Sequence, residues 1–238
     1  MQWENEGIVL SNKRLVENKA IMTLFTKDYG LKRGLCSRKT AVDLGNVVYC
    51  RWSARLEAQL GYFRLEAKEI ISPFLFTDYK KLKLLNAVLS ILLRVLPENE
   101  PQREIYKIFI QLLQAFKSNT LCYYRRYIEV ELSILRHLGF QLDLSRCAVT
   151  GETKNLFYIS PKTGRAVTKA VGEAYKDKLL LLPPSLYKIA NGLSIEDEIS
   201  QEEFSDCIRV TTFFLRTFLF FLLHLDLPYH RKSVLECV

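Results

Sequence analysis

The sequence lacks the motifs of most nucleotide-dependent enzymes and the long apolar runs of membrane proteins. It has neither a G-x-x-x-x-G-K phosphate loop nor a G-x-G-x-x-G turn, and its 3 histidines lie in no metal-binding spacing. The most apolar segment, residues 213–225, is interrupted by Arg216, and the nine uncharged residues that follow fall short of the roughly 20 that a bilayer span requires. We therefore expect no catalytic centre, no cofactor, no bound metal and no transmembrane helix.

The 6 cysteines are scattered and form no close pair. In a chain of 238 residues this distribution is typical of reduced thiols in a cytoplasmic protein. The N-terminal segment MQWENEGIVL has acidic residues where a secretory signal needs positive charge. We expect a cytoplasmic protein, associated with the nucleoid if it binds DNA as the charge pattern indicates.

Positive charge is concentrated in the first part of the chain. The net charge is +8, yet residues 147–238 carry equal numbers of basic and acidic side chains. Between Lys13 and Arg64 there are 11 basic and 4 acidic side chains, a local net charge of +7. A polyanionic partner would therefore meet this region first.

Aromatic residues are interleaved with these cations, which is typical of a surface that neutralises phosphates and stacks bases. The alternative is a solvated surface whose aromatic residues serve a barrel core. That alternative is favoured for any single residue, whereas nucleic acid is favoured for the region as a whole. The candidate DNA-binding residues are Lys13, Arg14, Lys27, Lys32, Arg33, Arg38, Lys39, Arg51, Arg55 and Arg64.

The first part of the chain alternates short β-like runs with turn signals at Asn18, Gly30, Gly45 and Gly61. Five short strands in about 70 residues suit a small closed barrel, and an oligonucleotide-binding barrel of this size is most often an OB-fold. The expected strands cover residues 7–11, 20–26, 31–37, 46–54 and 62–71.

From residue 77 the pattern becomes helical. Asp78 can cap a helix that ends before Pro97, and Pro101 can occupy the first turn of the next helix. A helix over residues 123–138 should stop at Gly139, because glycine suits the left-handed cap. Ser200 and Glu203 form a capping-box pattern before a last helix that should run to about Leu225.

Several segments resemble, in the same order, those of the RecO family of bacterial recombination mediators. They include LGNVVYCRW, LPENEP, ELSILRHLGFQLDLSRCAVTG and YISPKTGRAV, and the resemblance covers essentially the whole chain. It implies an α+β protein with an N-terminal five-stranded OB-fold β-barrel for DNA binding in residues 1–76. A helical domain in residues 77–238 should follow, with a degenerate zinc-ribbon-like insertion in residues 145–180.

The resemblance also implies a function in DNA repair without catalysis. RecO-like proteins bind single- and double-stranded DNA and anneal complementary strands. With RecR they help load RecA onto DNA coated by single-strand binding protein, in the RecF pathway. A non-catalytic protein-binding adaptor with little DNA affinity of its own is the alternative. A nuclease is disfavoured because the aspartate-rich metal site it would need is missing.

The ribbon-like module departs from the zinc-binding members of the family. Two C-x-x-C pairs hold zinc in many RecO-like chains, because four thiolates complete its tetrahedral shell. Here Cys147 is present, whereas Thr150, Thr168 and Val171 stand at the other three positions. One thiolate cannot hold structural zinc, so we expect a metal-free module resembling the alphaproteobacterial branch.

The resemblance further implies that the helical domain receives the acidic C-terminal tail of single-strand binding protein. Such a tail needs an apolar groove flanked by cations, because its aromatic end is desolvated while its carboxylates are paired. Arginines beside apolar helices are the informative residues, since they avoid deep burial unless paired. The candidate partner-binding residues are Arg125, Arg126 and Arg216.

Overall fold

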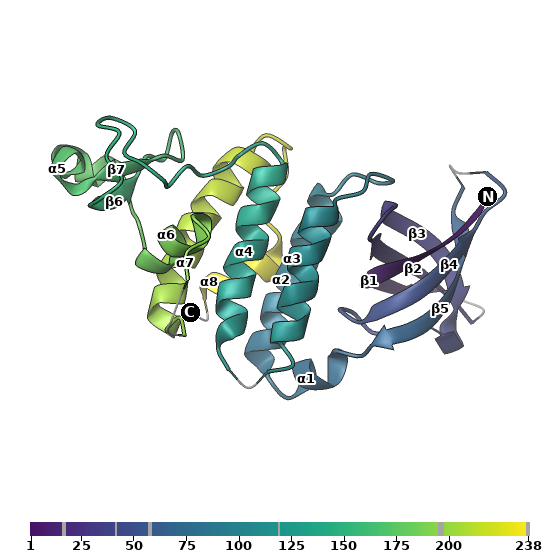
Figure 1. The fold of residues 1–238 in the computed structure, drawn as a ribbon. Coiled ribbons are helices and arrows are strands. Elements are labelled where there is room, and N and C mark those ends of the chain that lie inside the picture. Colours follow the sequence, from purple (N-terminus) through teal and green to yellow (C-terminus); the bar gives the residue numbers. More distant parts are fainter. Residues whose placement is uncertain (16–17, 41, 57–58, 119, 195–197, 237–238) are drawn as a thin grey trace. The chain divides into compact units, whose positions relative to one another are not determined.

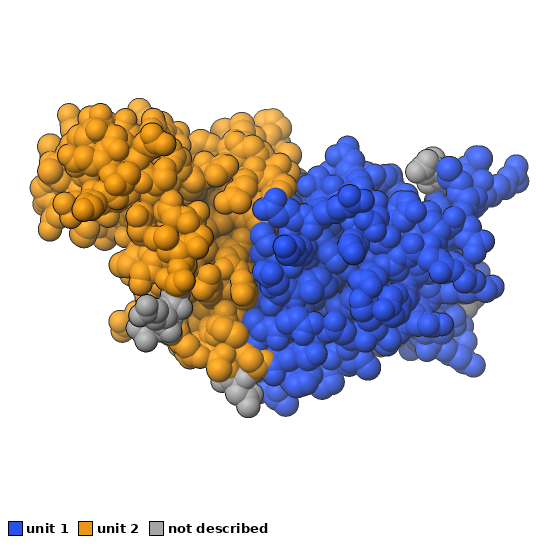
Figure 2. All heavy atoms as spheres, in the orientation of Figure 1, with its two compact units in different colours: residues 1–117 blue, residues 118–238 orange. Residues whose placement is uncertain are grey.

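A computed structural model describes residues 1–15, 18–40, 42–56, 59–118, 120–194 and 198–236. The chain forms two compact units, residues 1–117 and residues 118–238, which are coloured separately in Figure 2. Unit 1 contains a five-stranded barrel and unit 2 is helical with a small sheet, so the predicted α+β fold is confirmed. The predicted domain boundary after residue 76 stays a prediction.

The five strands of unit 1 close into an OB-like barrel in the order β1-β2-β3-β5-β4 (Figure 1). All neighbours are antiparallel except β3 and β5, which run parallel where Gly34 pairs with Gly61. β1 begins five residues earlier than predicted, because its first half pairs with β4 and its second half with β2. The strands are β1 (Gln2–Arg14), β2 (Lys19–Thr26), β3 (Gly30–Ser37), β4 (Val47–Ser53) and β5 (Gly61–Glu69).

Alternate residues of the strands fill the barrel. Val9, Met22, Trp52 and Phe63 are buried together in one cluster, as the period of two predicts for an inward face. Gly61 is required at the seam, because a Cβ there would lie 2.2 Å from the Trp52 ring. Some side chains of the opposite parity, such as Tyr49 and Tyr62, face outward, whereas others, such as Phe25, are buried as well.

Three helices complete unit 1. The Asp78 carboxylate accepts hydrogen bonds from the backbone N–H groups of Lys80 and Lys81, which confirms the predicted cap. Pro101 precedes the third helix instead of occupying its first turn, because Gln102 holds the N-cap position and the helix begins at Arg103. The helices are α1 (Ser72–Phe76), α2 (Tyr79–Val95) and α3 (Arg103–Ala115), and a short turn, η1 (Arg38–Thr40), links β3 to β4.

Unit 2 combines helices with a three-stranded sheet of order β7-β6-β8. Gly139 has a φ of +90° and ends α4, as predicted. The Ser200 hydroxyl caps α7, but the Glu203 carboxylate accepts a hydrogen bond from the Ser185 backbone, so it ties α6 to α7 instead of closing a capping box. The helices are α4 (Cys122–His137), α5 (Lys169–Gly172), α6 (Pro184–Ala190), α7 (Gln201–Phe214) and α8 (Tyr229–Leu235), with η2 (Glu173–Lys178) and the strands β6 (Leu156–Ile159), β7 (Ala166–Thr168) and β8 (Leu180–Leu181).

The last long helix ends earlier than predicted. After α7 the chain continues as a π-helical segment, η3 (Leu215–Phe220), and then turns. His224 has a φ of +52°, a left-handed conformation that stops a helix, so the prediction that it runs to Leu225 is wrong. Within the described part of the chain, every helix is too short or too polar to traverse a bilayer.

A buried ion pair joins three helices of unit 2. The Arg231 guanidinium on α8 donates to the Glu131 carboxylate on α4, with Nη2 at 3.0 Å from Oε2, and both side chains are fully buried. The Thr211 hydroxyl on α7 donates to the same carboxylate at 2.6 Å. These bonds pair charges that would otherwise be costly to bury, while Nη1 of Arg231 is buried without a hydrogen-bond partner among the described residues.

Candidate nucleic-acid interface

The outward side chains of the barrel form a continuous row across its strands. Lys13 of β1 pairs in register with Ile21 of β2, Ile21 with Leu35 of β3, and Leu35 with Tyr62 of β5. We call these four residues the outer strand row. Ile21, Leu35 and Tyr62 each neighbour a residue of the barrel core and Lys13 is exposed, so the row lies on the outer face of the sheet.

Five exposed cations gather at one end of this row, where β1 ends, β2 begins and β3 passes into η1. Lys19 lies opposite Ser37 in the sheet, and the Arg38 backbone N–H donates to the Asn18 carbonyl at 2.8 Å. No described carboxylate forms an ion pair with any of the five. Their charges therefore have no ion-pair partner within the described part of the barrel. This rim cluster is Lys13, Arg14, Lys19, Arg38 and Lys39.

Lys19 was missed by sequence reasoning, although it falls within the basic region. The sequence could have indicated it, because Lys19 follows the turn signal at Asn18 and begins a β-like run. Asn18 has a φ of +64°, and the Leu15 backbone N–H donates to the Lys19 carbonyl at 2.9 Å, which places Lys19 beside the end of β1.

Two other predicted residues lie on a face of mixed charge. Arg51 of β4 is paired with Glu4 of β1, and Arg64 of β5 lies directly opposite Arg51. A groove of about 660 Å³ on this face is also lined by Glu6 and Glu66. These acidic side chains make the face a poorer partner for phosphates than the rim cluster.

Arg33, Arg55 and Lys27 are exposed but dispersed. Arg33 is paired with Glu98, and Arg55 lies in the loop between β4 and β5. Lys27 lies in the β2–β3 turn next to Asp28. A hydrogen bond from Asn5, assisted by Arg103, lowers the pKa of the Asp28 carboxyl and keeps it charged.

Lys32 lies inside the barrel, contrary to its predicted place on the surface. It is 4% exposed, because β3 alternation directs it inward opposite Leu24. Its ammonium lies 5.0 Å from the centre of the Trp52 ring and 6.0 Å from that of Trp3. The cation–π contacts account for a lysine at this depth, and we leave it out of the proposed interface.

The aromatic residues interleaved with the cations differ in their exposure to solvent. Phe25, Trp52 and Phe63 are buried in the core of unit 1, as the structural alternative predicted. Tyr49 and Tyr62 face outward, and they are 49% and 40% exposed. Two tyrosines therefore remain available on the outer face to contact a base.

The ribbon-like module brings its four zinc-ligand positions together around Cys147, with Thr150 and Thr168 hydrogen-bonded to its sulfur. Cys147 Sγ lies 3.7 Å from Thr168 Oγ1 and accepts a hydrogen bond from the Thr168 backbone N–H at 3.4 Å. Val171 packs at the edge of the same cluster. No three His, Cys, Asp or Glu side chains among the described residues are grouped so that they could hold a metal ion.

The Cys147 thiol is polarised by its hydrogen bonds. Burial raises its pKa, but donors from Thr150, Thr168 and Val149 outweigh burial and lower the pKa of Cys147 to about 6. The thiolate form of Cys147 is thus stabilised without a metal ion.

We expect the thiolate absorbance of Cys147 near 240 nm to titrate with a midpoint near pH 6. An unfolded cysteine titrates near pH 8.5, so the charged form favours the fold. This contribution is fully present above about pH 8.5 and is lost as the pH falls through about 6. Unfolding curves of the wild type and of Cys147→Ser should therefore converge towards low pH. A gap between them that stays constant from pH 5 to 9 would contradict the assignment.

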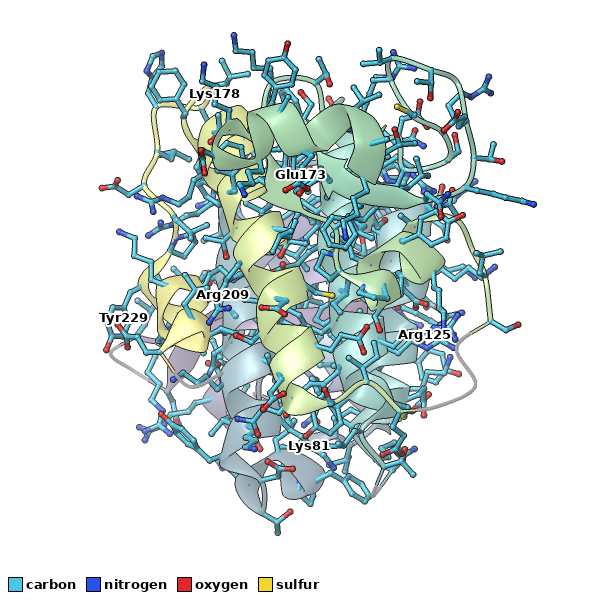
Figure 3. All side chains as sticks on the ribbon, turned by 90° about the vertical axis from the view of Figure 1, so that its left-hand side faces the viewer. Lys81, Arg125, Glu173, Lys178, Arg209 and Tyr229 are labelled. Atoms are coloured by element: carbon cyan, nitrogen blue, oxygen red, sulfur yellow. The ribbon has the colours of Figure 1, made fainter. Side chains whose placement is uncertain are left out.

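The three predicted partner-binding arginines lie on different elements and differ in their ion pairing. Arg125 and Arg126 of α4 both form ion pairs with Glu129 on the same helix. Arg216 of η3 is exposed and lines a groove of about 540 Å³ with Arg209, Phe213, Phe221 and neighbouring threonines. Figure 3 shows Arg125 and Arg209 on opposite sides of α7, so these helices do not bring all the arginines to one groove.

Comparison with known proteins identifies the family of this chain. The family "Recombination protein O N terminal" matches residues 1–74, and "Recombination protein O C terminal" matches residues 77–220. The chain belongs to the RecO family. It is 38% identical over 240 residues to the DNA repair protein RecO of Wolbachia sp. subsp. Drosophila simulans (strain wRi), covering 99% of this chain and 100% of that protein.

Two further relatives carry the same name. The RecO of Anaplasma marginale (strain St. Maries) is 39% identical over 220 residues, and these cover 91% of each chain. The RecO of Rickettsia canadensis (strain McKiel) is 34% identical over 225 residues, covering 92% of this chain and 90% of that protein. The predicted membership of the RecO family and the resemblance to its alphaproteobacterial branch are confirmed. This RecO-family chain is a DNA repair and recombination protein.

Proposed function

We propose that this RecO-family chain is a non-enzymatic recombination mediator that binds single- and double-stranded DNA through its barrel. In this function it anneals complementary strands and, with RecR, helps load RecA onto DNA coated by single-strand binding protein. Family membership supports the class of function, and the rim cluster supports the mode of binding.

The observation that carries the proposal is the uncompensated charge of the rim cluster. Its five cations are exposed, lie on three adjoining elements and have no described carboxylate as an ion-pair partner. Each lysine or arginine that contacts a phosphate releases condensed counterions, so affinity should fall steeply with salt and depend little on sequence.

A strand-annealing assay tests the proposed activity. Purified protein should accelerate annealing of two complementary oligonucleotides, both free and coated with single-strand binding protein. If the protein accelerates neither reaction, the proposed mediator function is contradicted. The adaptor alternative predicts a different pattern, in which the protein binds its partner protein while its affinity for DNA is absent or insensitive to salt.

The groove beside Arg216 is the proposed site for the acidic tail of single-strand binding protein. Phe213 and Phe221 provide apolar walls, and Arg209 and Arg216 provide cations at its edge. Arg216 is exposed and forms no ion pair with a described carboxylate, whereas Arg209 is paired with Asp206. This groove has the combination of apolar and cationic surface that such a tail requires.

Arg216→Glu should weaken binding of a tail peptide by roughly tenfold or more, because a cation that pairs with a carboxylate becomes a repelling anion. Arg125→Glu is the matched control, since Arg125 is held by Glu129 outside this groove. A fluorescence titration with a labelled tail peptide measures both. Equal binding by the wild type and Arg216→Glu would place the tail elsewhere.

A further inference from the structure

The outer strand row carries an aromatic side chain whose position suits contact with a nucleobase. We propose that Tyr62 is a base-stacking residue that gives the barrel a preference for single-stranded nucleic acid. This inference rests on the proposed DNA binding and specifies how one part of the strand is held.

Tyr62 faces outward because of the alternation along β5. Phe63 and Leu65, on the opposite parity, belong to the barrel core, whereas Tyr62 is 40% exposed. The position at the parallel seam between β3 and β5 leaves its ring without a ring partner in the described part of the chain. The exposed part of the ring is therefore accessible to a base.

The neighbours of Tyr62 extend its apolar surface into a strip. Leu35 is its register partner on β3 and Ile21 is the next on β2, and both are partly exposed. Strands lie about 4.8 Å apart, so the row from Lys13 to Tyr62 spans about 14 Å. A strip of this length matches a few stacked or splayed bases with a cation at its end.

Cations adjoin the strip at one end, where the rim cluster lies beside Lys13. Arg33 and Arg64 also face outward, but Arg33 is paired with Glu98 and Arg64 lies opposite Arg51 on the face of mixed charge, so neither is assigned to the strip. An apolar strip that ends in a cluster of cations complements a strand whose phosphates are anionic and whose base faces are apolar. A duplex hides those faces inside its stack, so the strip distinguishes single strands from double strands.

Tyr49 provides an internal contrast. It also faces outward and is 49% exposed, but it lies on the face of mixed charge. The Lys68 ammonium lies 5.1 Å from the centre of its ring and is itself paired with Glu6. Tyr49 is therefore a matched control, an exposed tyrosine of the same barrel without the apolar strip.

The test compares an oligothymidylate with an abasic strand of equal length, using fluorescence anisotropy and the full-length protein. Tyr62→Ala should weaken binding of the oligothymidylate roughly tenfold, the effect of losing one stacked base, and should leave the abasic strand unaffected. Tyr62→Phe and Tyr49→Ala should bind both strands as the wild type does. The salt dependence should stay unchanged, because no cation is removed.

Circular dichroism verifies folding, and Tyr62→Thr, which keeps a strand-favouring residue, replaces Tyr62→Ala if the latter fails to fold. Unchanged affinity for oligothymidylate, or an equal loss on both strands, would overturn the stacking role while leaving the proposed DNA binding intact. If the wild type binds neither strand at low salt, the proposed function fails and the stacking role fails with it.

Discussion

Replacing Lys13, Lys19, Arg38 and Lys39 together by glutamine should weaken DNA binding by roughly 100- to 1,000-fold near 0.1 M salt. These four cations of the rim cluster are exposed and have no described carboxylate to neutralise them. If each contacts one phosphate, the slope of log affinity against log salt on single strands should decrease in magnitude by about 3. The loss should be similar for all sequences, because phosphate contacts carry no base information.

The double variant Arg51→Gln and Arg64→Gln is the control for this prediction. These two arginines lie on the same barrel, but Glu4 and Glu66 neighbour them. Their removal should change affinity much less than removal of the rim cluster. A loss in proportion to the charge removed, about half as large on a logarithmic scale for these two arginines as for the four rim cations, would mean that net charge alone determines binding, with no defined site at the rim.

Arg231→Met should lower the free energy of unfolding by about 3–5 kcal/mol, the largest effect on stability that we expect. The substitution leaves the fully buried Glu131 carboxylate without its ion-pair partner. The Thr211 hydroxyl alone cannot compensate a charge at that depth. Chemical denaturation followed by circular dichroism measures the difference.

Pairing Arg231→Met with Glu131→Leu should recover most of this loss, because an apolar pair of similar volume leaves no unpaired charge. Arg209→Ala removes an exposed pair with Asp206 and should change stability by less than about 1 kcal/mol. A double variant as unstable as Arg231→Met alone would contradict this explanation.

Much of the fold could be predicted from local sequence signals. The Asp78 and Ser200 caps and the Gly139 stop are found as expected, because each depends on a residue and its immediate neighbours. The start of β1 could not be predicted, since its first half is ordered by pairing with β4, which lies more than 40 residues along the chain. The early end of the last helix likewise had no clear local signal.

The site was less predictable than the fold. Charge density identified the basic region but could not separate Lys32, which strand alternation directs into the barrel, from Lys19, which completes the rim cluster. Only the register between strands shows that Leu35 and Tyr62 adjoin. Arg125 and Arg216 were predicted as members of one group, but one is paired within its own helix and the other lines a groove.

The central claim is that the barrel grips the phosphate backbone of DNA through the rim cluster. The most direct test is the affinity of the wild-type protein for a labelled oligothymidylate across a series of salt concentrations. We expect a linear fall of log affinity with log salt, with a slope of about −3 or steeper if at least four cations contact phosphates. A slope near zero, or no binding at about 50 mM salt, would contradict the account.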